Sequence, residues 1–247
     1  MKTTPSIIAL IPARSGSSRL PNKNIKPFAG FPLIAYTIAA AKLSGIFSAI
    51  VVSTDSEQYA EVARKYGAEV PFLRPADLSG SLSPDIEWLE FTLNRLKDMG
   101  RTYDCFSILR PTSPFRLPET IQRAWNNFLQ EEDVDSLRAV ELCHQHPGKM
   151  WIVKGNRMTP LLPNNQDQHP WHSIPYQALP EIFVQNASLE IAWSRVVFEG
   201  HSIAGKVIMP FLTLGYEGFD INKPYDWELA ERLVKDGEAR LPEVKTK

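Results

Sequence analysis

The chain has 247 residues, of which 43% are apolar and 22% charged, and its formal net charge is -1. This composition is typical of a globular protein with an ordinary core, and the charge argues against bulk nucleic-acid binding, which needs a strongly basic face. No apolar stretch reaches the roughly 20 residues of a membrane span, and two cysteines exclude a disulfide scaffold and predict free thiols in a reducing cytoplasm.

Buried strands and amphipathic helices are predicted to alternate through about the first 130 residues. Apolar runs predict strands at 7–11, 49–54, 68–73 and 105–109. Helices are predicted at 32–42, between a cap at Thr54 or Asp55 and Gly67, between a cap at Ser83 and Gly100, and from Pro118 onward. This alternation predicts βαβ units and a mostly parallel sheet. The first apolar run is short and leads into a cationic loop, so we expect no secretory signal.

After Ser136 the pattern changes. Further strands are predicted at 136–143, 149–155, 183–193 and 206–212, and a last helix begins at Pro224. Residues 156–182 are rich in Pro, Asn, Gln and His and have no clear periodicity. We interpret them as part of an extended arm or lobe that packs on something else.

The loop after the first strand combines cations with small residues. Its members are Arg14, Gly16, Ser17, Ser18, Arg19, Lys23 and Lys26. Ligands of open α/β sheets bind outside the carboxyl ends of the strands, where cations and backbone N–H groups can hold a polyphosphate. The loop has neither the Walker A ending nor the G-x-G-x-x-G fingerprint. It is therefore either a phosphate loop of a third kind or a solvated basic turn.

Three other polar positions follow predicted strands. Asp55 ends "STD", for which we favour the role of a helix cap. Arg74 and Arg110 both precede a proline, which pins the backbone at the edge of the sheet. Each arginine is either a surface charge or part of a site, and their equivalent positions leave the two interpretations balanced.

The segment before the last helix carries candidate metal ligands. Asp220 and Asn222 are two residues apart, so their side chains point the same way in an extended segment. Oxygen ligands at this spacing suit Mg²⁺, which keeps waters and substrate phosphates as its other ligands. For Asp226 we favour a first-turn acid that the helix dipole stabilises. The five histidines lack zinc-type spacing with the cysteines.

Together these motifs resemble the cytidylyltransferases that activate eight- and nine-carbon keto-sugar acids, and most closely the acylneuraminate (sialic acid type) branch. The resemblance covers nearly the whole chain. It is carried by "IPARSGSSRLPNKNI", "PLIAYTIAAA", "VVSTDSEQYAEVARKYGAEVPFLRPADL", "RPTSPFR", "HPGKM", "VQNA" and "FDINKPYDWELAE". It implies a nucleotide-diphospho-sugar transferase-like α/β fold with a mostly parallel central sheet and flanking helices. It also implies transfer of CMP from CTP to the anomeric hydroxyl of a nonulosonic acid, with release of pyrophosphate and a requirement for Mg²⁺.

The resemblance also implies roles for single residues. Arg14, Lys23 and Asp220 would be catalytic, with Ser17 on the triphosphate and Asn24 beside it. Arg74, Arg110, Thr112 and Ser113 would line the cytosine and ribose pocket, whereas Lys149, Gln185 and Asn186 would lie near the sugar. Asp220 and Asn222 would hold the metal. The protein would be one domain spanning 1–247, with an inserted lobe at 140–182 that reaches the partner subunit of a homodimer.

Several positions depart from the pattern of the resembled branch. Asn222 stands where the metal motif commonly has a second acid, Tyr176 where the lobe commonly has an arginine, and Glu190 where a tyrosine is usual. These departures leave the sugar acid unidentified and keep a non-catalytic nucleotide-binding relative as one alternative. A CMP-Kdo synthetase is the other, against which "KNIKPFAG" and the "FDIN" segment argue.

Overall fold

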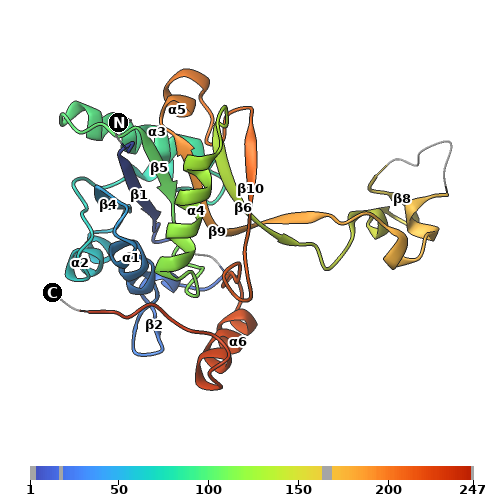
Figure 1. Ribbon diagram of the computed structural model, residues 1–247. Helices are drawn as coiled ribbons and strands as arrows, with labels where there is room; N and C mark the ends of the chain where they lie inside the picture. The colour runs from blue at the N-terminus through green and yellow to red at the C-terminus, as the bar shows by residue number, and fades with distance from the viewer. Residues whose placement is uncertain (1–3, 17–18, 163–168, 246–247) are drawn as a thin grey trace. The chain divides into compact units, whose positions relative to one another are not determined.

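The computed structural model of the protein describes residues 4–16, 19–162 and 169–245. Within these residues, the main sheet has six strands in the order β10-β6-β9-β5-β1-β4 (Figure 1). The strands are β1 (Ile7–Pro12), β4 (Ala49–Ser53), β5 (Cys105–Ile108), β6 (Ser136–Leu142), β9 (Phe183–Trp193) and β10 (Ile208–Leu212). β1 is parallel to both β4 and β5, whereas β9 runs antiparallel to β5. The prediction of an α/β fold with a mostly parallel central sheet is confirmed.

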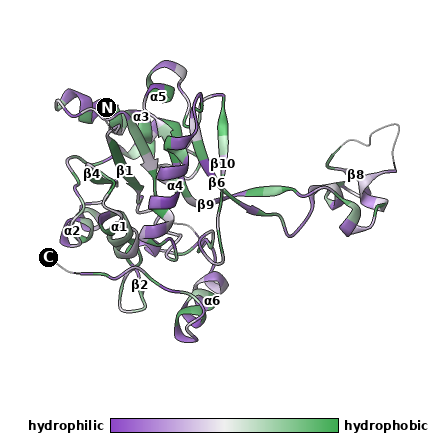
Figure 2. Ribbon diagram, in the orientation of Figure 1, coloured by the Kyte–Doolittle hydropathy of each residue, from purple (hydrophilic) through white to green (hydrophobic). Residues whose placement is uncertain are grey.

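Alternation along β1 gives the sheet two apolar faces. Ile7, Ala9 and Ile11 belong to one buried cluster, and Ile8 and Leu10 to another, as the period of two in a strand requires. Figure 2 shows the apolar residues concentrated along the strands. Both faces are therefore covered, which is typical of parallel sheets.

Helices supply the covering layers. They are α1 (Leu33–Ser44), α2 (Glu57–Lys65), α3 (Asp85–Asp98), α4 (Pro118–Gln130), α5 (Arg195–Gly200) and α6 (Pro224–Lys235). α1, α2 and α4 pack on the face of Ile7, and α3 and α5 pack on the face of Ile8. α6 buries Trp227, Ala230 and Leu233 in a third cluster with Phe28 and Phe115, which fixes the segment that precedes it.

Two local predictions were wrong. The strand expected at 68–73 is a single bridge between Glu69 and Val51, because Pro71 has no N–H to continue the ladder. Ser83 does not cap α3: Pro84 occupies the N-cap position, and the Ser83 hydroxyl donates to the carbonyl oxygen of Asp77 at 3.3 Å.

The chain divides into two compact units, Met1–Ala139 with Asn186–Lys247 and Val140–Gln185. Among its described residues, the second unit contains the antiparallel hairpin of β7 (Trp151–Lys154) and β8 (Arg157–Pro160) and three short 3-10 turns. Its buried His146 accepts a hydrogen bond from the N–H of Gly148 at 2.9 Å and contacts the rings of Trp171 and Tyr176. Across the described residues, no helix combines the length and the apolar character that crossing a membrane demands.

Candidate active site

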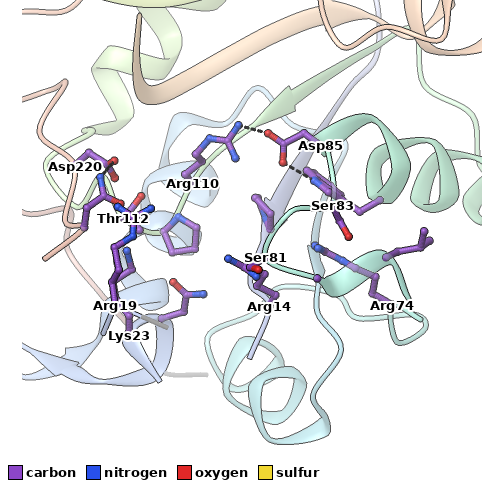
Figure 3. A pocket seen from close by; sticks show the side chains of 17 residues that line it. Arg14, Arg19, Lys23, Arg74, Ser81, Ser83, Asp85, Arg110, Thr112 and Asp220 are labelled. Atoms are coloured by element: carbon purple, nitrogen blue, oxygen red, sulfur yellow. Dashed lines mark hydrogen bonds and ion pairs between the residues drawn. The ribbon is translucent and has the colours of Figure 1, made fainter. Parts of the chain in front are cut away.

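A pocket of about 380 Å³ opens at the carboxyl end of β1 (Figure 3). It is lined by the loops that follow β1 and β5, by the segment between α2 and α3 with the first turn of α3, and by the segment before α6. Its wall carries the cations Arg14, Arg19, Lys23, Arg74 and Arg110 and the carboxylates Asp85 and Asp220. In Figure 3, Asp220, Arg19 and Lys23 lie on one side, and Arg74 and Asp85 lie on the other. The excess of cations favours an anionic ligand.

Asp55 fixes the start of the cationic loop. Its Oδ1 accepts a hydrogen bond from the backbone N–H of Ser15, and its Oδ2 accepts one from the Ser15 hydroxyl, both at 2.8 Å. The favoured interpretation of Asp55 as a helix cap was therefore wrong: Ser56 is the N-cap of α2, and no side chain caps it. Arg14 precedes Ser15, so the Asp55 carboxylate holds the backbone from which Arg14 enters the pocket.

Lys23 joins the cationic loop to the acidic segment. It begins the 3-10 turn η1 (Lys23–Ile25), which follows Asn22 in the left-handed region at a φ of 55°. Its Nζ donates to the carbonyl oxygen of Ile221 at 2.5 Å. Burial lowers the pKa of the Lys23 ammonium, although nearby Asp220 acts in the opposite direction. Lys23 and Asn24 are both buried and both line the pocket.

Asp220 faces the pocket with one carboxylate oxygen unsatisfied. Its Oδ2 accepts a hydrogen bond from the Asn222 amide, whereas its Oδ1 is buried without a hydrogen-bond partner among the described residues. Asp226 has a different role, since its Oδ2 accepts the N–H groups of Asn222 and Lys223 at 2.8 and 2.7 Å and caps α6. Asp220 is thus the acid of this segment that keeps a free oxygen.

Arg74 crosses the end of β4. Its Nε and Nη2 donate to the hydroxyl and carbonyl oxygens of Ser53 at 3.1 and 2.8 Å, and its guanidinium lies 5.0 Å from the ring centroid of Trp88. Burial lowers the pKa of Arg74 to about 10, which leaves it charged at neutral pH. Arg74 is only 6% exposed, so its side chain is a fixed part of the pocket wall.

Arg110 is held by two carboxylates. Its Nη2 lies 2.6 Å from Asp85 Oδ2 and 3.0 Å from Glu190 Oε1, and the second oxygen of Glu190 lies 2.9 Å from Arg138 Nη1. Burial alone would lower the pKa of Arg110, but the two carboxylates outweigh it and raise the pKa. Four alternating charges thus run from the pocket wall into the protein, and they leave Arg110 little net charge to offer a phosphate.

The remaining residues of the nucleotide prediction are placed differently. Thr112 lines the pocket, and its carbonyl oxygen accepts the N–H of Ile221 at 2.8 Å. Ser113 is 1% exposed, and its hydroxyl has no partner among the described residues. Its side chain is absent from the pocket lining, so the position does not support direct contact with a ligand. Ser17 lies outside the described residues.

The residues expected near the sugar do not line this pocket. Asn186 donates from Nδ2 to Thr213 Oγ1 at 2.8 Å. Lys149, in the second unit, donates from Nζ to the carbonyl oxygens of His172 and Ile174 at 2.9 and 2.5 Å. Gln185 is exposed at the end of that unit. Lys149 thus stabilises the fold of its own unit, and its role toward a sugar stays a prediction.

Sequence reasoning missed Asp85, Trp88 and Glu190 as parts of the site. Asp85 Oδ1 accepts a hydrogen bond from Trp88 Nε1 at 2.8 Å, so the first turn of α3 presents both groups to the pocket. The acid in "SPDIEW" directly after a proline was the available signal, because a helix start at a sheet edge is a common ligand site.

The fold and the cationic pocket are those of a nucleotide-binding α/β protein. The family model described as Cytidylyltransferase matches residues 8–147, more than half of the chain, and the protein belongs to this family. The resemblance seen in the sequence is thereby confirmed.

Individual relatives agree. CMP-N,N'-diacetyllegionaminic acid synthase of Legionella pneumophila is 37% identical over 234 residues, which cover 93% of this chain and 96% of the relative. Pseudaminic acid cytidylyltransferase of Campylobacter jejuni is 39% identical over 151 residues, which cover 61% of this chain and 65% of the relative. A solved structure of CMP:2-keto-3-deoxy-manno-octonic acid synthetase complexed with CTP superposes with a TM-score of 0.68 over 94% of this chain and 99% of the other. At 12% identity this last likeness shows the fold alone.

Proposed function

We propose that the protein transfers CMP from CTP to the anomeric hydroxyl of a nonulosonic, sialic-acid-like sugar acid and releases pyrophosphate. The observation that carries the proposal is the convergence of Arg14, Arg19 and Lys23 with Asp220 in one pocket at the carboxyl edge of the sheet. The named relatives that act on legionaminic and pseudaminic acids support the acceptor class.

In the proposed reaction the anomeric hydroxyl attacks the α-phosphorus and pyrophosphate leaves. The cations of the first loop neutralise the charge that develops on the phosphate oxygens, which is the dominant means of catalysis for such transfers. Lys23 stands between the loop and the Asp220 segment, so it can follow the leaving pyrophosphate. Arg74, packed on Trp88, gives a rigid wall for the cytosine and ribose.

We propose Mg²⁺ as the cofactor, held by Asp220 with Asn222 beside it. The buried, unpartnered Oδ1 of Asp220 supports this assignment, because Mg²⁺ needs only one or two carboxylates when substrate phosphates complete its shell. When bound, Mg²⁺ supplies charge neutralisation and lowers the pKa of a bound hydroxyl. A neutral amide at 222 removes one charge, so we expect weaker metal binding than at a pair of acids.

We infer a homodimer, built through the second unit. That unit exposes the large apolar side chains Leu142, Trp151, Ile152, Val153, Met158, Leu161, Tyr176, Phe183 and Val184. Exposed apolar groups in such numbers favour a protein interface. Light scattering at several concentrations should give a dimer mass for the native chain and a smaller mass for Val153→Lys, with Leu82→Lys as the exposed control outside the unit. A monomer at every concentration would contradict the inference.

The two alternative functions have less support. The relatives at 37–39% identity are named for legionaminic and pseudaminic acids, so a CMP-Kdo synthetase is not favoured. A non-catalytic relative would bind CTP without turnover.

The two free thiols, one buried and one partly exposed, support our placing the protein in the reducing cytoplasm.

The test is pyrophosphate release with CTP and Mg²⁺ against a panel of nonulosonic acids, Kdo and a control without sugar. We expect release with one nonulosonic acid. Arg14→Ala should lose about 100-fold or more in turnover, whereas Arg232→Ala, at an exposed pair on α6, should not. Binding of CTP without release for any acid would favour the non-catalytic relative.

A further inference from the structure

Arg116 is the largest of the completely buried side chains among the residues that the structure describes. It is 1% exposed and lies in the loop between β5 and α4, six residues after Arg110. No acid among the described residues forms an ion pair with it. Burial lowers that pKa to about 9, so the guanidinium stays protonated at neutral pH. A buried cation without a counter-charge is rare, because buried charges are normally paired.

Neutral oxygens take the place of a counter-charge. Arg116 Nη1 donates to the carbonyl oxygen of Ser188 in β9. Its Nη2 donates to Thr37 Oγ1 in α1 at 3.0 Å and to the carbonyl oxygen of Arg110 at 3.3 Å. These dipoles orient the guanidinium and reduce its desolvation cost, but they do not cancel its charge.

The third hydrogen bond ties Arg116 to the wall of the pocket. Arg110 and Thr112 both line the pocket, and Thr112 in turn accepts the N–H of Ile221 at 2.8 Å. Arg116 itself is not in the lining. Its charge therefore acts on the pocket from within the protein, where water screens it much less than it screens a surface charge.

An apolar side chain of similar size could support the same loop at a lower desolvation cost. The charge of the Arg116 guanidinium therefore indicates a role that an uncharged Met or Leu could not perform. The pocket collects four other cations that are free of a carboxylate contact within the described residues, namely Arg14, Arg19, Lys23 and Arg74. All of them favour a polyanion.

We propose that Arg116 is a positioning residue for the nucleotide site, and that its unneutralised charge raises the affinity of the pocket for the triphosphate over the nucleoside. The inference rests on the proposed function, which makes CTP the nucleotide. It assigns to Arg116 two separable effects, a geometric one on the wall loop and an electrostatic one on the ligand.

Position 37 offers a matched pair of variants that separates these effects. Thr37→Asp places a carboxylate where Arg116 now meets a hydroxyl, and Thr37→Asn places a neutral group of the same shape there. We would titrate CTP and cytidine into each variant and into the native protein by calorimetry. Thr37→Asp should bind CTP about tenfold more weakly than Thr37→Asn does, and the two should bind cytidine within about twofold of each other. Arg116→Met should show the same selective loss for CTP.

Equal CTP affinity in the two position-37 variants would overturn the inference, and so would equal weakening of CTP and cytidine in Arg116→Met. If Arg116→Met does not fold, the comparison of Thr37→Asp with Thr37→Asn still tests the inference, since both variants keep Arg116. The proposed function is tested by the native protein in the same experiment. If the native protein binds and turns over CTP but the two position-37 variants bind it with equal affinity, only the inference about Arg116 is overturned. If the native protein binds no CTP, both this inference and the proposed function are overturned.

Discussion

The Nη2 atom of Arg110 lies 3.0 Å from Oε1 of Glu190, a carboxylate whose side chain is 5% exposed. The other oxygen of Glu190 lies 2.9 Å from Arg138 Nη1. One buried acid thus balances two arginines, and one of those arginines forms part of the pocket wall. The orientation of Arg110 in the site depends on a residue that no ligand touches in the proposed reaction.

Glu190→Gln should therefore lower the stability of the protein. The variant leaves Arg138 without its carboxylate partner and Arg110 with Asp85 alone, and we expect the free energy of unfolding to fall by about 3 kcal/mol. Urea denaturation measures it. Glu57→Gln, at an exposed pair with Arg64, should change stability by less than about 1 kcal/mol. Equal effects of the two variants would mean that the buried Glu190 network contributes no more to stability than an exposed ion pair does.

Lys23→Met should separate stability from activity. Burial lowers the pKa of Lys23, so the charged ammonium costs folding free energy at neutral pH, and this cost fades as the pH rises toward the unfolded value near 10.5. We expect the variant without ligand to melt at a higher temperature and to lose about 100-fold or more in turnover. A variant that melts lower and keeps its activity would contradict the assignment of Lys23.

Asp220→Asn should raise the concentration of Mg²⁺ needed for half-maximal activity. The variant removes the carboxylate whose Oδ1 lacks a partner among the described residues, so the charge that attracts the ion is lost. Calcium or manganese titration of the protein without CTP gives a second readout. Asp236→Asn, on an exposed pair at the end of α6, is the control. An unchanged metal requirement in Asp220→Asn would place the metal elsewhere.

Asp55→Ala should weaken CTP binding more than it slows the bound enzyme. The Asp55 carboxylate holds Ser15 through two hydrogen bonds of 2.8 Å, and without it the loop that carries Arg14 loses its anchor. We expect the KM for CTP to rise about tenfold, with a smaller change in kcat. Ser15→Ala, which removes one of the two bonds, should give an intermediate KM. The opposite order would exclude a positioning role.

Asp85 should make stability sensitive to acid. Burial favours its neutral form, but the hydrogen bond and charge of Arg110 outweigh burial and the pKa of Asp85 is lowered. Its contribution to stability is present above the unfolded pKa of about 3.9 and is lost as the pH falls through the folded value. The free energy of unfolding of Asp85→Asn should therefore fall less steeply below about pH 4 than that of exposed Asp98→Asn.

The nucleotide side of the pocket was accessible to sequence reasoning because its signals are local. Arg14, Lys23, Arg74 and Arg110 each stand directly after a predicted strand or within the loop that follows it. In a parallel sheet those ends meet at one edge, and the structure brings all four side chains into one pocket. The alternation also predicted the parallel strands and the helices between them, whereas the order of the six strands came only from the structure.

The remaining contacts join residues far apart in the chain. Asp55 meets Ser15 across 40 positions and Arg116 meets Thr37 across 79, and no spacing in the sequence indicates either pair. Glu190 was read as a departure from a family pattern, yet its position opposite Ile108 in the β5–β9 register decides what it contacts. Side-chain partners across a sheet are set by register, which a single sequence does not reveal.

The Lys23 ammonium and the Ile221 carbonyl oxygen are 198 residues apart. A ribosome must therefore synthesise the chain as far as residue 221 before the first loop can meet its acceptor. Nascent protein that ends before the Asp220 segment has the cations and the sheet but no closed site. Under the proposed function, CTP would stabilise chains that carry both segments and not shorter nascent ones, so the nucleotide would act on a late stage of folding.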